Sequence, residues 1–167
     1  MPTPLYHVLE TVTLTSSASS VTFSSIDQSY GDLILTVDAA NDAGKRPTDL
    51  NFNSDTGSNY SYVYALGYSS FALSSSNTSQ GRIRLVESGR TGTTFGTLLL
   101  FNIMDYAATD KHKSVLARGN SDSRQAVGME AHRWASTAAI TSLDVKPSSG
   151  NFIAGSTFTL YATTKAV

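Results

Sequence analysis

Apolar and polar side chains alternate with a period of two along much of this chain, and this rhythm constrains the fold more than any other feature. The clearest run places Tyr60, Tyr62, Tyr64, Leu66 and Tyr68 at every second position. Successive side chains of a β-strand point to opposite faces of the sheet, so this spacing indicates a strand. No stretch sustains the repeat of an amphipathic helix. The chain is therefore predicted to be all-β.

Turn clusters separate the alternating runs at short intervals along the 167 residues. About ten short strands with this spacing are typical of an antiparallel β-sandwich, here a jelly-roll-like one. Residues 1–167 are expected to form a single domain with a short extended N-terminal arm, at about residues 1–6. The Ser-rich residues 69–81 are expected to be an exposed connection. Residues 95–104 are almost continuously apolar, which predicts a strand covered on both faces.

Charge and cysteine content exclude several functional classes. The chain has 12 Lys and Arg against 13 Asp and Glu, a net charge of −1, so it lacks the basic surface that nucleic-acid binding needs. Without cysteine it can form neither disulfides nor thiolate metal sites. Charged residues make up 15% of the chain, below the roughly 25% of an average soluble protein. Ser and Thr supply the polar surface instead, as is common in β folds that pack against copies of themselves.

No motif for catalysis stands out. His7, His112 and His132 are far apart and lack the spacing of a metal-binding pair, which favours three unrelated surface histidines. The G-x-S-x-G elbow and the glycine-rich phosphate loops are absent. Nothing in the spacing of Glu87, Asp105 and Glu130 predicts a glycosidase pair, so all three are expected at the surface. The chain is predicted not to be an enzyme and to bind no metal or cofactor.

One segment carries oxygen atoms at alternate positions, on Asp49, Asn51, Asn53 and Asp55. It can be interpreted as a calcium loop or as a solvated strand edge that runs into a turn. An EF-hand loop needs glycine at its sixth position, and Ser54 stands there. The solvated strand edge is therefore favoured.

The tyrosines of the alternating run allow a functional and a structural interpretation. Tyrosine has a rigid apolar face and a polar tip, so a row of them could form a platform for a sugar ring or a protein partner. Alternatively, the same face packs into the sandwich with its hydroxyls at the rim, and this interpretation is favoured. Four tyrosines on one face are many for a core. Part of the row is therefore also expected at a subunit interface.

The N-terminal residues show neither the basic nor the apolar region of a signal peptide. The longest apolar run is far shorter than the roughly 20 residues of a membrane-spanning helix. We expect the protein to be made in a cytoplasm and to remain soluble.

Six segments carry a resemblance that spacing alone does not reveal: SVTFSSI at 20–26, NFNSDTGSNYS at 51–61, NIMDYA at 102–107, WASTAAITSL at 134–143, PSSGNF at 147–152 and AGSTFTLY at 154–161. Together, and in this order, they resemble a widespread family of small tailed-phage virion proteins. The similarity touches most of the chain and lies in turns and strand ends. At the third position of the 102–107 segment, Met104 replaces a proline that is usual in the family.

The resemblance implies a jelly-roll-like phage structural protein, and a capsid cement or decoration protein is the leading assignment. Such a protein would be located in the virion, on the capsid surface, bound to the major capsid protein. We expect a homo-oligomer, a trimer by analogy with the local three-fold positions of icosahedral lattices. The alternative is a tail-fibre or receptor-binding module that contacts host surface polysaccharide. Neither nucleic acid nor membrane is an expected partner.

The residues expected to contact a partner come from the N-terminal arm and the tyrosine row. In a cement protein, the arm would be free to fold onto capsid subunits. The candidates are Pro2, Pro4, Tyr6, Tyr60, Tyr62, Tyr64 and Tyr68.

Overall fold

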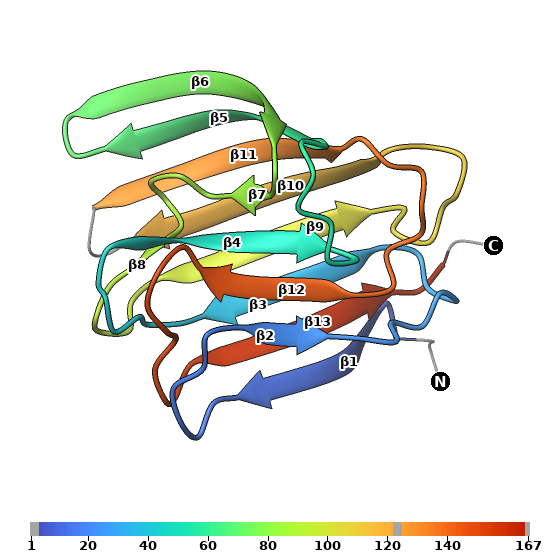
Figure 1. Ribbon diagram of the computed structural model, residues 1–167, viewed down its shortest axis with the longest axis horizontal. Helices are drawn as coiled ribbons and strands as arrows, with labels where there is room; N and C mark the ends of the chain where they lie inside the picture. The colour runs from blue at the N-terminus through green and yellow to red at the C-terminus, as the bar shows by residue number, and fades with distance from the viewer. Residues whose placement is uncertain (1–3, 122–124, 166–167) are drawn as a thin grey trace.

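The computed structural model describes residues 4–121 and 125–165, and these residues form thirteen strands (Figure 1). In chain order the strands are β1 (Tyr6–Thr13), β2 (Val21–Phe23), β3 (Leu33–Asp38), β4 (Arg46–Phe52), β5 (Tyr60–Tyr68), β6 (Phe71–Gln80), β7 (Ile83–Arg84), β8 (Arg90–Thr91), β9 (Leu98–Met104), β10 (Lys113–Ser121), β11 (Ala126–Trp134), β12 (Leu143–Pro147) and β13 (Thr157–Thr163). The count exceeds the predicted one partly because β8, of two residues, is too short to show alternation.

The strands form two antiparallel sheets that lie face to face (Figure 1). The larger sheet has eight strands in the order β1-β13-β3-β9-β10-β11-β5-β6. The smaller sheet follows the order β2-β12-β4-β7, and β8 pairs with β4 beside this path. The all-β sandwich prediction is confirmed. The part of the chain that the structure describes contains no helix that could cross a membrane.

Alternate residues of the central strands meet between the two sheets. Leu35 of β3 pairs with Phe101 of β9, and from the smaller sheet Phe52 of β4 pairs with Leu143 of β12. All four side chains are fully buried, and burying each of them stabilises the fold by about 1.5–3 kcal/mol. One connected cluster of apolar residues fills this space. The alternation of apolar and polar side chains in the sequence therefore predicts which face of each central strand is buried.

Trp134 ties one end of the sandwich together. Its ring meets Phe52 edge-on with centroids 5.5 Å apart and lies nearly parallel to Tyr60 at 6.3 Å. Its Nε1 donates a hydrogen bond of 2.7 Å to Oδ2 of Asp55. The Tyr60 hydroxyl accepts from the Phe52 backbone N–H and donates to the Asp55 carbonyl. Burial raises the pKa of Tyr60 to about 12, so that hydroxyl stays protonated even at alkaline pH and holds the turn onto the core.

Two segments differ from their sequence-based predictions. Residues 71–80 form the strand β6 rather than a connection. This strand is the last of the larger sheet and its side chains are open to solvent, so no apolar period marks it. The second segment is β9, which alternates between buried and more exposed positions. Its apolar run is therefore covered on one face only.

Replacing Trp134 with alanine should destabilise the protein by about 3–5 kcal/mol, because it removes a buried aromatic ring and leaves a cavity. The free energy of unfolding can be measured by urea titration. The control is Val8→Ala, since Val8 is 62% exposed and should change stability by no more than about 0.5 kcal/mol. A loss below about 1 kcal/mol for Trp134→Ala would contradict the packing described above.

Asp55 should make stability depend on pH. Burial raises the pKa of Asp55, but hydrogen bonds from Trp134, Asn59 and Gly57 outweigh it and leave the pKa below its ordinary value of 3.8. A carboxylate of this kind stabilises the fold above its unfolded-state pKa, and the contribution is lost as the pH falls through the folded-state pKa. The free energy of unfolding should therefore fall between about pH 5 and pH 2.

The Asp55→Asn variant should lose part of this acid dependence, as urea titrations at several pH values would measure. Asp110→Asn is the matched control because Asp110 is an exposed carboxylate. Equal slopes for wild type and Asp55→Asn would show that the hydrogen bonds to Asp55 do not stabilise its charged form.

Candidate docking surface

The predicted tyrosine row lies on the face of β5 that is turned toward the smaller sheet, at varying depth. Tyr60 is 1% exposed and packs in the core, so its prediction as a partner-binding residue is wrong. Tyr62 and Tyr64 are half-buried and stack on each other with centroids 6.1 Å apart. Tyr68 is half-buried at the end of the strand. The row is therefore mainly part of the sandwich, as the structural interpretation expects.

The predicted N-terminal arm is attached to the end of β13 wherever the structure describes it. Pro2 lies outside the described residues. The Thr164 hydroxyl donates to the Pro4 carbonyl over 2.7 Å, and the Thr164 N–H donates to the Leu5 carbonyl over 2.9 Å. Tyr6 is the first residue of β1 and is 57% exposed. Pro4 and Tyr6 are thus held by the sheet rather than free, which differs from the expected arm.

A histidine and a carboxylate meet inside the sandwich. His132 Nε2 lies 3.3 Å from Glu130 Oε2, and both side chains are 0% exposed, so the predicted surface positions are wrong. They are buried because the alternation of β11 directs every second side chain inward. The Val86 N–H donates to Glu130 Oε1 over 3.0 Å, and the Tyr62 ring packs 5.7 Å from the imidazole. This closed arrangement presents neither group to a substrate.

The alternating polar side chains of β4 are hydrogen-bonded within the protein. Asp49 and Asn51 are each 2% exposed, so the solvated edge predicted for them is wrong. Arg84 donates two hydrogen bonds of 2.6 and 2.8 Å to Asp49, and the Asn51 amide donates to the carbonyls of Asp55 and Gly81. Within residues 4–121 and 125–165, no group of three His, Asp or Glu side chains is placed to hold a metal ion.

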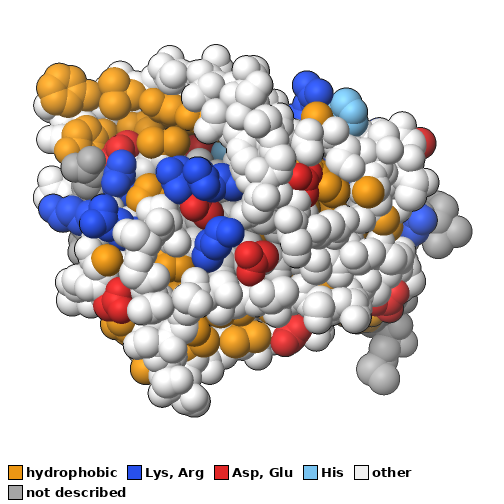
Figure 2. Space-filling view, viewed as in Figure 1, with side chains coloured by type: hydrophobic (Ala, Val, Ile, Leu, Met, Phe, Trp, Pro, Cys, Tyr) orange, Lys and Arg blue, Asp and Glu red, His pale blue; other side chains and the backbone are white. Residues whose placement is uncertain are grey.

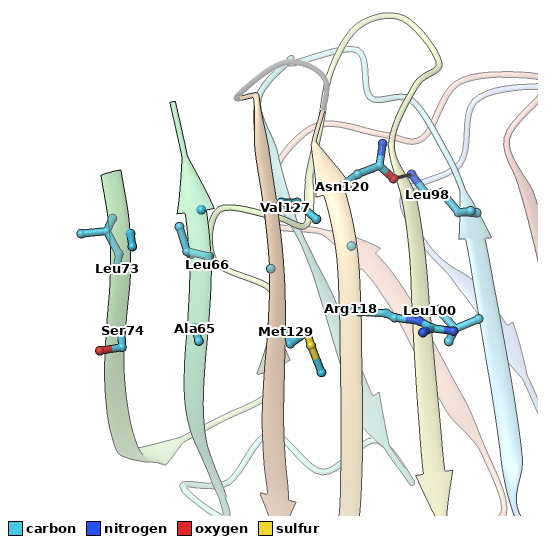
Figure 3. Close-up of a pocket in the computed structure, with 14 residues that line it drawn as sticks. Ala65, Leu66, Leu73, Ser74, Leu98, Leu100, Arg118, Asn120, Val127 and Met129 are labelled. Carbon is cyan, nitrogen blue, oxygen red and sulfur yellow. Dashed lines mark hydrogen bonds between the residues drawn. The ribbon is translucent and has the colours of Figure 1, made fainter. Parts of the chain in front are cut away.

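The candidate site lies on the outer face of the larger sheet, turned away from the smaller sheet (Figure 3). Residues paired across neighbouring strands point to the same side, and the registers of β5, β11, β10 and β9 align two rows of them. We call these two rows the docking face. In strand order they are Gly67, Val127, Asn120, Leu98 and Ala65, Met129, Arg118, Leu100.

The docking face is both hollow and apolar. Gly67 and Ala65 leave space beside the larger side chains of β11, and the hollow has a volume of about 1000 Å³. Val127 is 65% exposed, Met129 55% and Leu98 53%. Monomeric soluble proteins rarely leave large contiguous apolar surface open unless it binds something. Exposure of these three side chains therefore identifies the outer face as the best candidate for partner contact.

Two polar side chains belong to the docking face. The Asn120 amide is used within the chain, because its Oδ1 accepts from the Leu98 N–H over 3.1 Å and its Nδ2 donates to the Gly96 carbonyl over 2.9 Å. Arg118 lies beside Leu100 (Figure 3) and is the one charged residue among the described residues that line the hollow. A partner would thus meet an apolar floor with a single positive charge.

The partner-binding residues predicted from the sequence do not include the docking face. The sequence nevertheless marks this face with runs of consecutive apolar residues. Residues 98–100 are three consecutive leucines, and Ala126 and Val127 are adjacent apolar residues at the start of β11. Such runs predict strands covered on both faces. The same pattern arises where one face of a strand packs in the core and the other face is exposed in the monomer and binds a partner.

The dye 8-anilinonaphthalene-1-sulfonate fluoresces when it binds exposed apolar surface, and it should bind the folded protein at the docking face. The double variant Val127→Ser with Met129→Ser should bind less dye without loss of stability, because both side chains are exposed. The control is Val8→Ser, which removes a valine of similar exposure (62%) from β1. Equal loss of fluorescence in both variants would contradict a distinct site on the outer face.

No family model matches the chain, and no curated protein matches it. Among solved structures, a human SPRY domain is 8% identical, with a TM-score of 0.38, over 96% of this chain and 99% of that one. A protein of unknown function from Shewanella oneidensis MR-1 is 7% identical, with a TM-score of 0.22, over 97% of this chain and 77% of that one. Likenesses this distant say nothing about function.

Proposed function

We propose that this chain is a non-enzymatic structural protein of a tailed-phage particle, and that it acts as a capsid cement protein on the outside of the head. The single observation that carries the docking role is the exposed apolar floor of the docking face, formed by Val127, Met129 and Leu98. The phage assignment rests on the six sequence segments that resemble small virion proteins. The proposed occupant of the docking face is the major capsid protein.

The chemistry of the docking face suits adhesion better than reaction. Burying a fully exposed side chain of this size contributes about 1.5–3 kcal/mol, and Val127 and Met129, which are 65% and 55% exposed, would each contribute part of it. Arg118 offers one site for a carboxylate of the capsid subunit, which would orient the contact. The side chains of His132 and Glu130, which lie 3.3 Å apart, are sealed from solvent. That burial supports a protein without a catalytic role.

A cement protein acts by mass action. A ligand that binds only the assembled shell stabilises that state in proportion to its occupancy, and contacts repeated over a lattice multiply weak affinities through avidity. Each copy therefore needs only a weak affinity for the capsid shell. A sandwich with a buried apolar core and an open outer sheet face meets this requirement.

Electron microscopy of purified particles of the phage that encodes the chain tests the proposal directly. We expect hundreds of copies on the head, with the outer face of the larger sheet against the capsid shell. A handful of copies at the tail would overturn the cement assignment in favour of a receptor-binding module. Absence from the particle would overturn the virion role altogether.

A variant tests whether the docking face makes the contact. Val127→Lys with Met129→Lys places two more positive charges beside Arg118, and burying them without partners is costly. Occupancy on heads that lack the protein should fall at least about tenfold, which corresponds to about 1.4 kcal/mol of binding free energy. Val8→Lys on β1 is the control and should bind as wild type does. Unchanged occupancy of the double variant would place the contact elsewhere.

A further inference from the structure

The strand β6 forms one edge of the larger sheet and is open along its whole length. It runs for ten residues, of which nine are exposed and the last is half-buried. The stretch from Phe71 to Asn77 pairs regularly with β5, and the register then shifts before Gln80. Ser79, with a φ of 56°, lies at that irregularity. Seven regular residues therefore present their outward backbone N–H and C=O groups to solvent.

Features that normally protect an edge strand are missing from the regular part of β6. Natural edges are blunted by charged residues, proline or bulges, but residues 71–80 contain neither a charge nor a proline. The opposite edge of the same sheet differs, because β1 carries Glu10 and a register shift between Val8 and Glu10. The two edge strands of the larger sheet thus differ, because β1 is protected against pairing with a strand of another molecule and β6 is not.

The hairpin of β5 and β6 also projects beyond the smaller sheet (Figure 1). On the face turned toward the smaller sheet, Phe71 is 64% exposed and Leu73 is 44% exposed. Figure 2 shows apolar side chains gathered over this end of the hairpin, at the upper left of the view. On the opposite face, Val63 of β5 is 53% exposed. A strand added to β6 would therefore find both backbone partners and apolar side chains beside it.

We propose that β6 pairs antiparallel with β6 of a second copy of this chain, so that two larger sheets join into one continuous sheet across a two-fold axis. A second copy fits because such an axis brings each strand against itself, so a charge near the axis would lie beside its own copy. The uncharged β6 avoids that repulsion. A register centred on Ser74 would place Phe71 opposite Asn77 and keep all seven regular residues paired.

The geometry of this contact has a consequence for the outer face. In an antiparallel pair, residues opposite each other point to the same side, so a Ser74-centred register keeps both docking faces on one side of the joined sheet. The dimer would then present two adjacent hollows. The contact itself does not depend on the capsid proposal, and it differs from the trimer expected by analogy.

The isolated protein tests the proposal by its mass as a function of concentration, measured by sedimentation equilibrium. Pairing of seven residues buries less than the roughly 800 Å² per partner of a standard interface, so we expect a reversible dimer. The mass should rise from 17.8 kDa toward twice that value as the concentration increases into the hundreds of micromolar. A single-chain mass throughout this range, or a trimer, would overturn the proposal.

Ser74→Lys identifies the contact, because it places a lysine against its own copy at the centre of the edge. The variant should remain monomeric at concentrations where the wild type dimerises, with an unchanged unfolding transition because residue 74 is exposed. Val8→Lys on the opposite edge should dimerise as the wild type does. A Ser74→Lys dimer as strong as the wild-type dimer would overturn pairing through β6. Wild-type protein that stays monomeric and still coats phage heads would overturn the dimer alone and leave the cement role intact.

Discussion

The unequal width of the two sheets is the constraint on which the rest of this structure depends. Each sheet must bury one apolar face, but eight strands lie on one side and a path of four strands with β8 beside it lies on the other. The smaller sheet covers the central strands, where Leu35 and Phe101 are fully buried. It does not extend over the hairpin of β5 and β6 (Figure 1). The projecting edge and the half-buried tyrosines follow from this mismatch.

The sequence predicts the buried half of this arrangement well, because burial imposes alternation. Leu33, Leu35 and Val37 alternate in the sequence and are fully buried in β3. The Ser-rich strand β6 escapes such prediction for a physical reason. Its backbone pairs with β5, but neither face is packed against other residues. No alternation of apolar side chains is therefore needed to form this strand. Asp49 is missed for the opposite reason, since its carboxylate is buried beside Arg84 of another strand, which donates two hydrogen bonds to it.

The candidate site is harder to predict than the fold, because the sequence shows which side chains are apolar but not which of them another part of the protein covers. Leu98 and Leu99 are neighbours of the same type, yet one is 53% exposed and the other is fully buried. Only the sheet arrangement distinguishes them. His132 shows the same limit, since its burial beside Glu130 depends on which face of β11 turns inward. Wherever both faces of a strand are apolar, the sequence therefore predicts either a covered strand or an interface.

The low charge of this protein bears on both proposed contacts. A net charge of −1 with 15% charged residues produces little long-range repulsion between copies, so neighbouring molecules can approach closely. In a free monomer, an uncharged edge and an apolar outer face are liabilities that favour uncontrolled association. In an ordered assembly the same two surfaces are satisfied separately, the edge by a strand and the outer face by an apolar partner. The two proposed contacts thus differ in chemistry, because backbone hydrogen bonds would join the edge of β6 to its partner and apolar side chains would cover the docking face.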